Sequence, residues 1–141
     1  MTLQKTLAII KPDAVAAGNI GVIINEIEKN GFQIVALKML QLTTFQAEGF
    51  YAVHRERPFF GDLVEFMTEG PVVAMILQKD NAILEWRNLM GATDPAQAEE
   101  GTIRKKYGAS LQNNATHGSD AEDTAAFETR YFFNAMEIVQ K

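Results

Sequence analysis

The chain has 141 residues, of which 47% are hydrophobic and 22% charged, with a formal net charge of −5 and no cysteine. This length and composition favour one globular domain over residues 1–141, and the lack of cysteine excludes a disulfide framework and a thiolate metal site. The negative charge argues against broad nucleic-acid binding, although a small anion needs only a few well-placed lysines and arginines. The longest apolar run, residues 72–77, is about a third of a membrane span, and no export signal is visible, so we expect a cytoplasmic protein.

Residues 6–10 predict a short buried strand. The next element reads as a helix with one buried stripe, because four isoleucines fall at i, i+3, i+4 and i+7: Ile20, Ile23, Ile24 and Ile27. Asn30-Gly31 is a typical helix end, and the apolar, partly β-branched residues 32–42 predict a second strand.

Thr43 and Gln46 match a capping box that would open a helix running to about residue 54. A second stripe at the same helical spacing follows, made of Phe60, Leu63, Val64 and Met67. Gly70-Pro71 ends that helix, and residues 72–77 predict a third strand.

Asp80 could cap a helix that carries a third apolar stripe and stops at Gly91; the stripe is Ile83, Trp86, Leu89 and Met90. Residues 92–115 show little periodicity apart from a short helical turn over 103–107, and long irregular segments in compact domains are usually functional. Ser119 and Glu122 match another capping box, which would open a last helix. The order of elements predicts an α/β (α+β) sandwich of the ferredoxin-like βαββαβ type, with a small antiparallel sheet covered by helices.

His117 lies among small polar residues, two positions before this capping serine. A phosphoryl group on the imidazole would lie in the field of the helix N-terminus, and histidine can form covalent intermediates. Asp120 and Glu128 are candidate orienting partners. A solvated or structural histidine is the alternative from this stretch alone; a metal site lacks partner ligands, and a serine dyad lacks a nucleophile elbow.

No glycine-rich phosphate loop is present, so side chains would have to hold any phosphate. The candidates are Lys11, directly after the first strand, with Arg87, Thr93 and Arg104. Each also has a structural interpretation, such as a solvated strand end or a partner of a helix dipole. The decisive question is whether they converge.

Phe59 is adjacent to the buried stripe and therefore points away from it, which suits a residue that stacks on a planar base. Packing against another loop is the alternative. The Tyr51 hydroxyl could reach a reacting group or simply complete the core. His54 shares a helix face with Tyr51, and we expect a structural role for it.

Six motifs follow one another along the chain: TLAIIKPDA at 6–14, RPFF at 57–60, GPV at 70–72, MGAT at 90–93, GTIR at 101–104 and NATHGSD at 114–120. With these motifs the chain closely resembles the nucleoside diphosphate kinase family over essentially its full length. The resemblance implies a ferredoxin-like fold and a ping-pong transfer of the γ-phosphoryl group from a nucleoside triphosphate to a nucleoside diphosphate. A nucleotide phosphohydrolase with His117 as general base, or a non-catalytic nucleotide-binding module, are the competing hypotheses.

Carried over by motif, His117 is the nucleophile and Glu128 orients its ring, while Lys11 and Tyr51 assist near the transferring group. Lys11 and Asn114 would contact the sugar hydroxyls. The remaining implied contacts are Arg87, Thr93 and Arg104 to the phosphates, Phe59 to the base, and Leu63 and Leu111 beside it.

The resemblance also implies Mg²⁺ held by the substrate phosphates rather than by direct protein ligands. Because stacking reads no base edge, purines and pyrimidines should both be accepted. Family members assemble, so a homo-oligomer is expected. The chain ends at Lys141, which is shorter than in animal relatives, so tetramer and hexamer both stay open.

Overall fold

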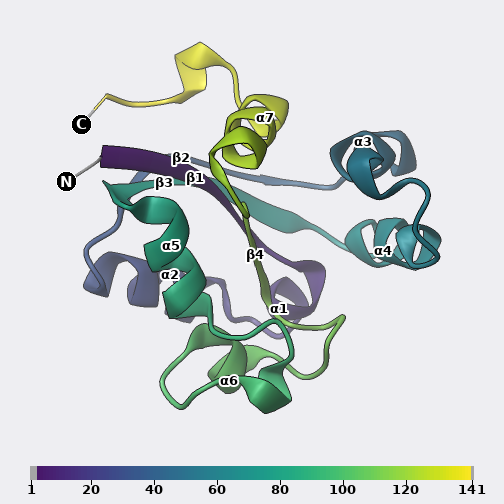
Figure 1. Ribbon diagram of the computed structural model, residues 1–141, viewed down its shortest axis with the longest axis horizontal. Helices are drawn as coiled ribbons and strands as arrows, with labels where there is room; N and C mark the ends of the chain where they lie inside the picture. The colour runs from purple at the N-terminus through teal and green to yellow at the C-terminus, as the bar shows by residue number, and fades with distance from the viewer. Residues whose placement is uncertain (1–2, 141) are drawn as a thin grey trace.

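The computed structural model describes residues 3–140 as a four-stranded antiparallel sheet covered by helices (Figure 1). The strands are β1 (Leu3–Ile10), β2 (Gln33–Leu40), β3 (Val72–Asp80) and β4 (Thr116–Gly118), in the spatial order β2-β3-β1-β4. This arrangement confirms the predicted ferredoxin-like α+β sandwich.

The α-helices are α1 (Pro12–Ala16), α2 (Ile20–Lys29), α3 (Thr44–Phe50), α4 (Phe60–Met67), α5 (Ala82–Met90), α6 (Ile103–Tyr107) and α7 (Glu122–Phe132). Short 3₁₀ turns cover Ala52–His54, Pro95–Gln97 and Ala135–Glu137. Among residues 3–140, no helix is both long and apolar enough to cross a membrane.

Both faces of the sheet are buried, because side chains alternate along each strand. Leu7 and Ile9 of β1 face a core that α3, α4 and α7 cover. Ala8 and Ile10 face a second core under α2 and α5 (Figure 1). Because both faces of β1 are buried, its sequence is a continuous apolar run rather than an alternating one. Each fully buried aliphatic side chain contributes about 1.5–3 kcal/mol to the stability of the fold.

The capping box at Thr43 is present as predicted, with the Thr43 Oγ1 accepting from the Gln46 N–H at 3.1 Å. The α-helix that it opens ends at Phe50 and continues only as a 3₁₀ turn to His54.

The prediction that Asp80 caps α5 is wrong. Strand β3 runs on to Asp80, where it pairs with Leu3, so the cap position falls to Asn81 in the left-handed region at φ 55°. The Asn81 side chain does not cap the helix. Instead, the Gln4 side chain from β1 accepts from the Ile83 N–H at 3.0 Å.

The second predicted capping box, Ser119 with Glu122, is also wrong. Helix α7 starts at Glu122, and Ala121 occupies the cap position. The Oγ1 of Thr124 accepts from the N–H groups of Asp120 and Ala121, at 3.2 and 2.9 Å. Ser119 is thereby free of a capping role, and its hydroxyl serves the histidine site described below.

Candidate active site

A cleft of about 770 Å³ lies beside β4, and it gathers residues that are far apart in the sequence. Its walls come from the ends of β1 and β4, from α5, from the segment around α6, and from the α3–α4 hairpin (residues 44–67). Most of the predicted site residues line it: Lys11, Tyr51, Leu63, Arg87, Thr93, Arg104, Asn114 and His117. The candidate cations therefore converge around the histidine.

Lys11 projects from the end of β1 into a network with the segment before β4. Its Nζ donates to the Asn114 Oδ1 at 2.8 Å, and the Asn114 Nδ2 donates to the Thr93 carbonyl at 3.0 Å. Burial, and secondly the nearby charge of Arg104, lower the pKa of Lys11 to about 8, although Asp13 opposes the shift. The lysine is thus a desolvated cation whose hydrogen-bonding direction is already fixed.

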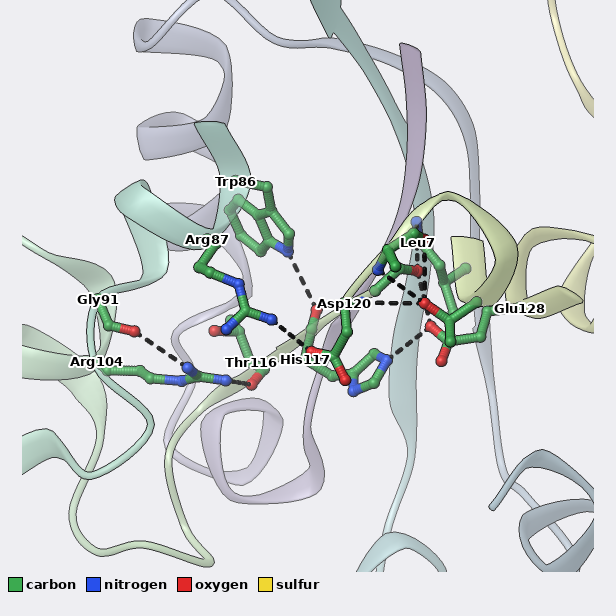
Figure 2. A network of polar contacts seen from close by, with 12 residues as sticks. Leu7, Trp86, Arg87, Gly91, Arg104, Thr116, His117, Asp120 and Glu128 are labelled. Carbon is green, nitrogen blue, oxygen red and sulfur yellow. Dashed lines mark hydrogen bonds and ion pairs between the residues drawn. The ribbon is translucent and has the colours of Figure 1, made fainter. Parts of the chain in front are cut away.

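His117 is oriented by Glu128, which reaches it from α7 (Figure 2). The His117 Nε2 lies 2.9 Å from the Glu128 Oε1, and the Ser119 hydroxyl donates to the same oxygen at 2.7 Å. A carboxylate only accepts, so Nε2 carries the ring hydrogen and the Nδ1 lone pair is left available. The Ser119 Oγ also accepts from the Leu7 N–H at 3.3 Å, which ties the triad to β1.

The other candidate orienting partner, Asp120, is not used in this way. Its carboxylate pairs with the Arg87 guanidinium on the opposite side of His117 (Figure 2). Of the two carboxylates that the sequence offered, Glu128 holds the ring and Asp120 holds an arginine. Helix α7 begins at Glu122, so its N-terminus lies further along the chain from His117 than the predicted capping serine implied.

The backbone of His117 is fixed by Trp86, a contact that the sequence analysis missed. The indole Nε1 donates to the His117 carbonyl at 3.1 Å (Figure 2). A Cβ on Gly118 would lie 2.5 Å from the Trp86 Cδ1, so only glycine fits beside the indole. Trp86 reads from the sequence as one member of a buried stripe, and no sequence pattern indicates its polar contact.

The two predicted phosphate-binding arginines differ in their surroundings. Arg104 is buried and donates to the carbonyls of Gly91 and Thr116 at 3.1 and 2.9 Å (Figure 2). Burial, and then the charge of Arg87, lower the pKa of Arg104 to about 10. Arg87 is half-exposed, and its guanidinium pairs with Asp120. One arginine is therefore preorganised, while the other can turn toward an incoming phosphate.

Tyr51 is 6% exposed, and burial, reinforced by the charge of Glu128, raises its pKa. Its hydroxyl is consequently a neutral donor at the cleft. The edge of the Phe50 ring also approaches His117, with 5.5 Å between the ring centroids.

Three predicted site residues do not line the cleft. Glu128 lies behind His117, as its hydrogen bond requires. Phe59 is 46% exposed at the start of α4, with its ring 5.7 Å from that of His54, which does line the cleft. Leu111 is exposed in the loop before β4. The structure thus leaves Phe59 and Leu111 outside the polar part of the site.

The fold and the site together define a class of protein. It is an α+β sandwich whose cleft presents three cations and an imidazole with one nitrogen held by a carboxylate, which is the equipment for accepting a phosphoryl group.

Comparison with known proteins agrees with this class. The family model described as nucleoside diphosphate kinase matches residues 4–138. A nucleoside diphosphate kinase from Trichlorobacter lovleyi is 58% identical over 97% of this chain and 99% of its own length. The structure of the Aquifex aeolicus nucleoside diphosphate kinase superposes with a TM-score of 0.97 at 44% identity, covering 98% of this chain and 100% of that one. The Halobacterium salinarum enzyme, solved in complex with CDP, gives 0.95 at 40% identity, covering 99% of this chain and 93% of that one.

The chain therefore belongs to the nucleoside diphosphate kinase family, as its six sequence motifs indicated. It is a phosphotransferase of the class that moves a phosphoryl group from a nucleoside triphosphate to a nucleoside diphosphate by a ping-pong reaction.

Proposed function

We propose that the phosphoryl group is carried on the Nδ1 of His117. The Nδ1 lone pair attacks the γ-phosphorus, the bond from that phosphorus to the β-phosphate oxygen breaks, and the nucleoside diphosphate leaves. In the second half-reaction a terminal oxygen of another nucleoside diphosphate attacks the phosphohistidine, and the P–N bond breaks. The observation that carries this assignment is the 2.9 Å contact between Nε2 and Glu128, which leaves Nδ1 as the nucleophilic nitrogen.

The cations stabilise the charge on the transferring group. Lys11 and Tyr51 act next to it, and Arg87, Thr93 and Arg104 hold the remaining phosphates. Lys11 and Asn114, already bonded to each other, receive the sugar hydroxyls. Phosphoryl transfer gains most from such positioning and fixed charge, because the transition state needs little covalent help.

The base rests against the α3–α4 hairpin, stacked on Phe59 and flanked by Leu63 and Leu111. These contacts are apolar, so they read the face of the base and not its edge. We expect purine and pyrimidine nucleotides to be used with similar kcat/KM, and a preference of several hundredfold for one base would contradict this.

Mg²⁺ would enter with the nucleotide, held by its phosphates. Glu99 and Asp120 are the acidic residues of the cleft lining, and Asp120 is paired with Arg87. Within residues 3–140 no group of three or more histidine, cysteine, aspartate or glutamate residues could hold a metal ion. The donor set fits an ion carried by the substrate, where it would offset phosphate charge.

We further propose that residues 1–141 act as one domain, that the chain forms a homo-oligomer, either tetramer or hexamer, and that it works in the cytoplasm, where nucleoside triphosphates are abundant. Sedimentation velocity checks the assembly, and cell fractionation checks the compartment.

Incubation with γ-labelled ATP and Mg²⁺ tests the reaction. We expect acid-labile, base-stable label on the protein that moves to added GDP and is lost in His117→Ala. Label found only as free phosphate would indicate a hydrolase, and unlabelled protein that still binds nucleotide would indicate a binding module; either result overturns the proposal.

A further inference from the structure

Ala115 has an unfavourable backbone conformation beside the site. Its φ is 74°, and it shares positive φ with only one other non-glycine residue in the described part of the chain. The Thr116 N–H donates to the Asn114 carbonyl at 2.9 Å, across Ala115, which is the i→i+2 pattern of a γ-turn. A γ-turn with positive φ at its centre is rare and strained in an L-residue, so contacts outside the turn must hold it.

Those contacts come from the residues that follow β1. The Ala115 carbonyl accepts from the Lys11 backbone N–H at 2.8 Å, and the Ala115 N–H donates to the Asp13 Oδ2 at 3.1 Å. Only the second bond depends on a side chain. The other oxygen of this carboxylate, Oδ1, is buried without a hydrogen-bond partner among residues 3–140. Asp13 is only partly buried, but burial still raises the pKa of its carboxyl. A carboxylate with one buried, unsatisfied oxygen is unfavourable by itself, which indicates a function for the bond that Asp13 does make.

The turn sets the position of two residues of the site. Asn114, on one side of Ala115, bonds to Lys11 and to the Thr93 carbonyl. His117 lies two residues beyond Ala115, in β4 opposite Ile9. A relaxed turn would therefore change both the lysine–asparagine pair and the approach of the imidazole to the phosphate.

We propose that Asp13 is a positioning residue for phosphoryl transfer: its carboxylate holds the strained turn at Ala115 and thereby aligns Asn114 and His117 with Lys11. Asp13 does not line the cleft, so it would act through the turn rather than on the substrate directly. The inference rests on the proposed role of His117 as the phosphoryl acceptor.

Rescue by glycine tests this proposal, because glycine adopts positive φ without strain and needs no clamp. The readout is the single-turnover rate of protein labelling at saturating γ-labelled ATP, normalised to the folded fraction. We expect Asp13→Ala to slow labelling by about 10–100-fold, since small misalignments have effects of this order. Asp13→Asn, whose amide oxygen can still accept from Ala115, should stay within about threefold of wild type.

The double variant Asp13→Ala/Ala115→Gly should recover at least about tenfold of the lost rate. The matched control is Asp13→Ala/Ala17→Gly, because Ala17 is an exposed alanine nearby with an ordinary φ of −78°. It should recover nothing. Should Asp13→Ala fail to fold, Asp13→Glu replaces it, since this change keeps the charge but moves the carboxylate by one methylene.

A purely structural role for Asp13 predicts wild-type labelling once the folded fraction is taken into account. That result, or equal rescue by the Ala17 and Ala115 changes, overturns the inference. The two proposals fail differently: if wild-type protein takes no label on His117, the proposed function fails, whereas labelled wild type with an unaffected Asp13→Ala rejects only the role of Asp13.

Discussion

The two walls of the cleft are built in opposite ways. On the sheet-side wall, Lys11 and Arg104 are buried and His117 is partly buried, and each of these side chains already has hydrogen-bond partners. On the hairpin wall, Leu63 lines the cleft and is half-buried, and Phe59 lies just outside the lining and is more exposed. Tyr51, which is buried and acts beside the transferring group, is the exception on this wall.

This difference separates chemistry from recognition. Preorganised charges are most effective where charge develops in the transition state, so the sheet-side wall should control kcat. Apolar contacts that make no base-edge hydrogen bonds bind different bases equally, so the hairpin wall should control KM without selecting one base. The following predictions either break this division or sharpen it.

The largest effect is expected at the nucleophile. His117→Ala should lower kcat by about 10⁵-fold or more, because no other group replaces the imidazole nitrogen. His54→Ala, the matched change on the hairpin wall, should lower kcat less than about tenfold. Steady-state kinetics with ATP and GDP measure both, and equal losses would show that the two histidines have been assigned wrongly.

Glu128 should come next. Glu128→Ala removes the partner of Nε2, and we expect kcat to fall about 10²-fold through loss of ring orientation. Glu128→Gln should lose less, about tenfold, because one amide oxygen can accept the same two bonds without the charge. A Gln variant slower than the Ala variant would contradict this explanation.

Phe59→Ala tests the hairpin wall. Base–aromatic stacking contributes about 1–3 kcal/mol, so KM should rise about 5–100-fold while kcat stays close to wild type. The rise should be similar for ADP, GDP and CDP, and Leu111→Ala should have a weaker effect of the same kind. A fall in kcat with unchanged KM would place Phe59 in the chemistry.

The pKa of Lys11, about 8, predicts that the pH profile of activity falls on its alkaline side. Above about pH 8 kcat/KM should fall about tenfold per pH unit, as the lysine loses its proton, whereas bound phosphates should move the limb of kcat to higher pH. Stability should change in the opposite direction. Between about 8 and the ordinary value of 10.5 the unfolded lysine holds more protons than the folded one, so the Lys11 contribution to the free energy of unfolding rises with pH. Denaturation of wild type and Lys11→Met across this window measures it, and a falling contribution would refute the burial of the charged lysine.

The smallest effect is expected at Trp86, whose hydrogen bond goes to the backbone carbonyl of His117 and not to its ring. Trp86→Phe keeps an aromatic ring but loses the indole N–H, so kcat should fall a few-fold with KM unchanged. Trp86 is the single tryptophan of the chain, so its fluorescence reports on the surroundings of the His117 backbone.

Periodicity predicted the fold because the apolar stripes indicate directly which face of each helix or strand is buried in the core. The isoleucines of α2 and the apolar run of β3 needed no tertiary information. The helix starts were less reliable. Asp80 and Ser119 fit local capping rules, yet β3 extends through the first, and the second is taken by Leu7 and Glu128 from distant parts of the chain.

The same limit applies to the site. From the local sequence, Asp120 and Glu128 were both candidate partners of His117, and the family resemblance favoured Glu128. The structure has Glu128 on His117, and it adds the pairing of Asp120 with Arg87, which the sequence did not indicate. Asp13 lies in the first motif and Trp86 in a buried stripe, yet the sequence did not predict the polar role of either. Those roles depend on backbone groups of Ala115 and His117, which carry no sequence pattern of their own.

The position of the phosphoryl group on the imidazole ring tests the central claim most directly. NMR of the isolated phosphoenzyme, by ³¹P and by proton–nitrogen correlations of the His117 ring, distinguishes the two isomers. With Nε2 held by Glu128, the phosphorus must be on Nδ1, and the Nε2 hydrogen should remain. A phosphoryl group on Nε2, or on any residue other than His117, would contradict the account.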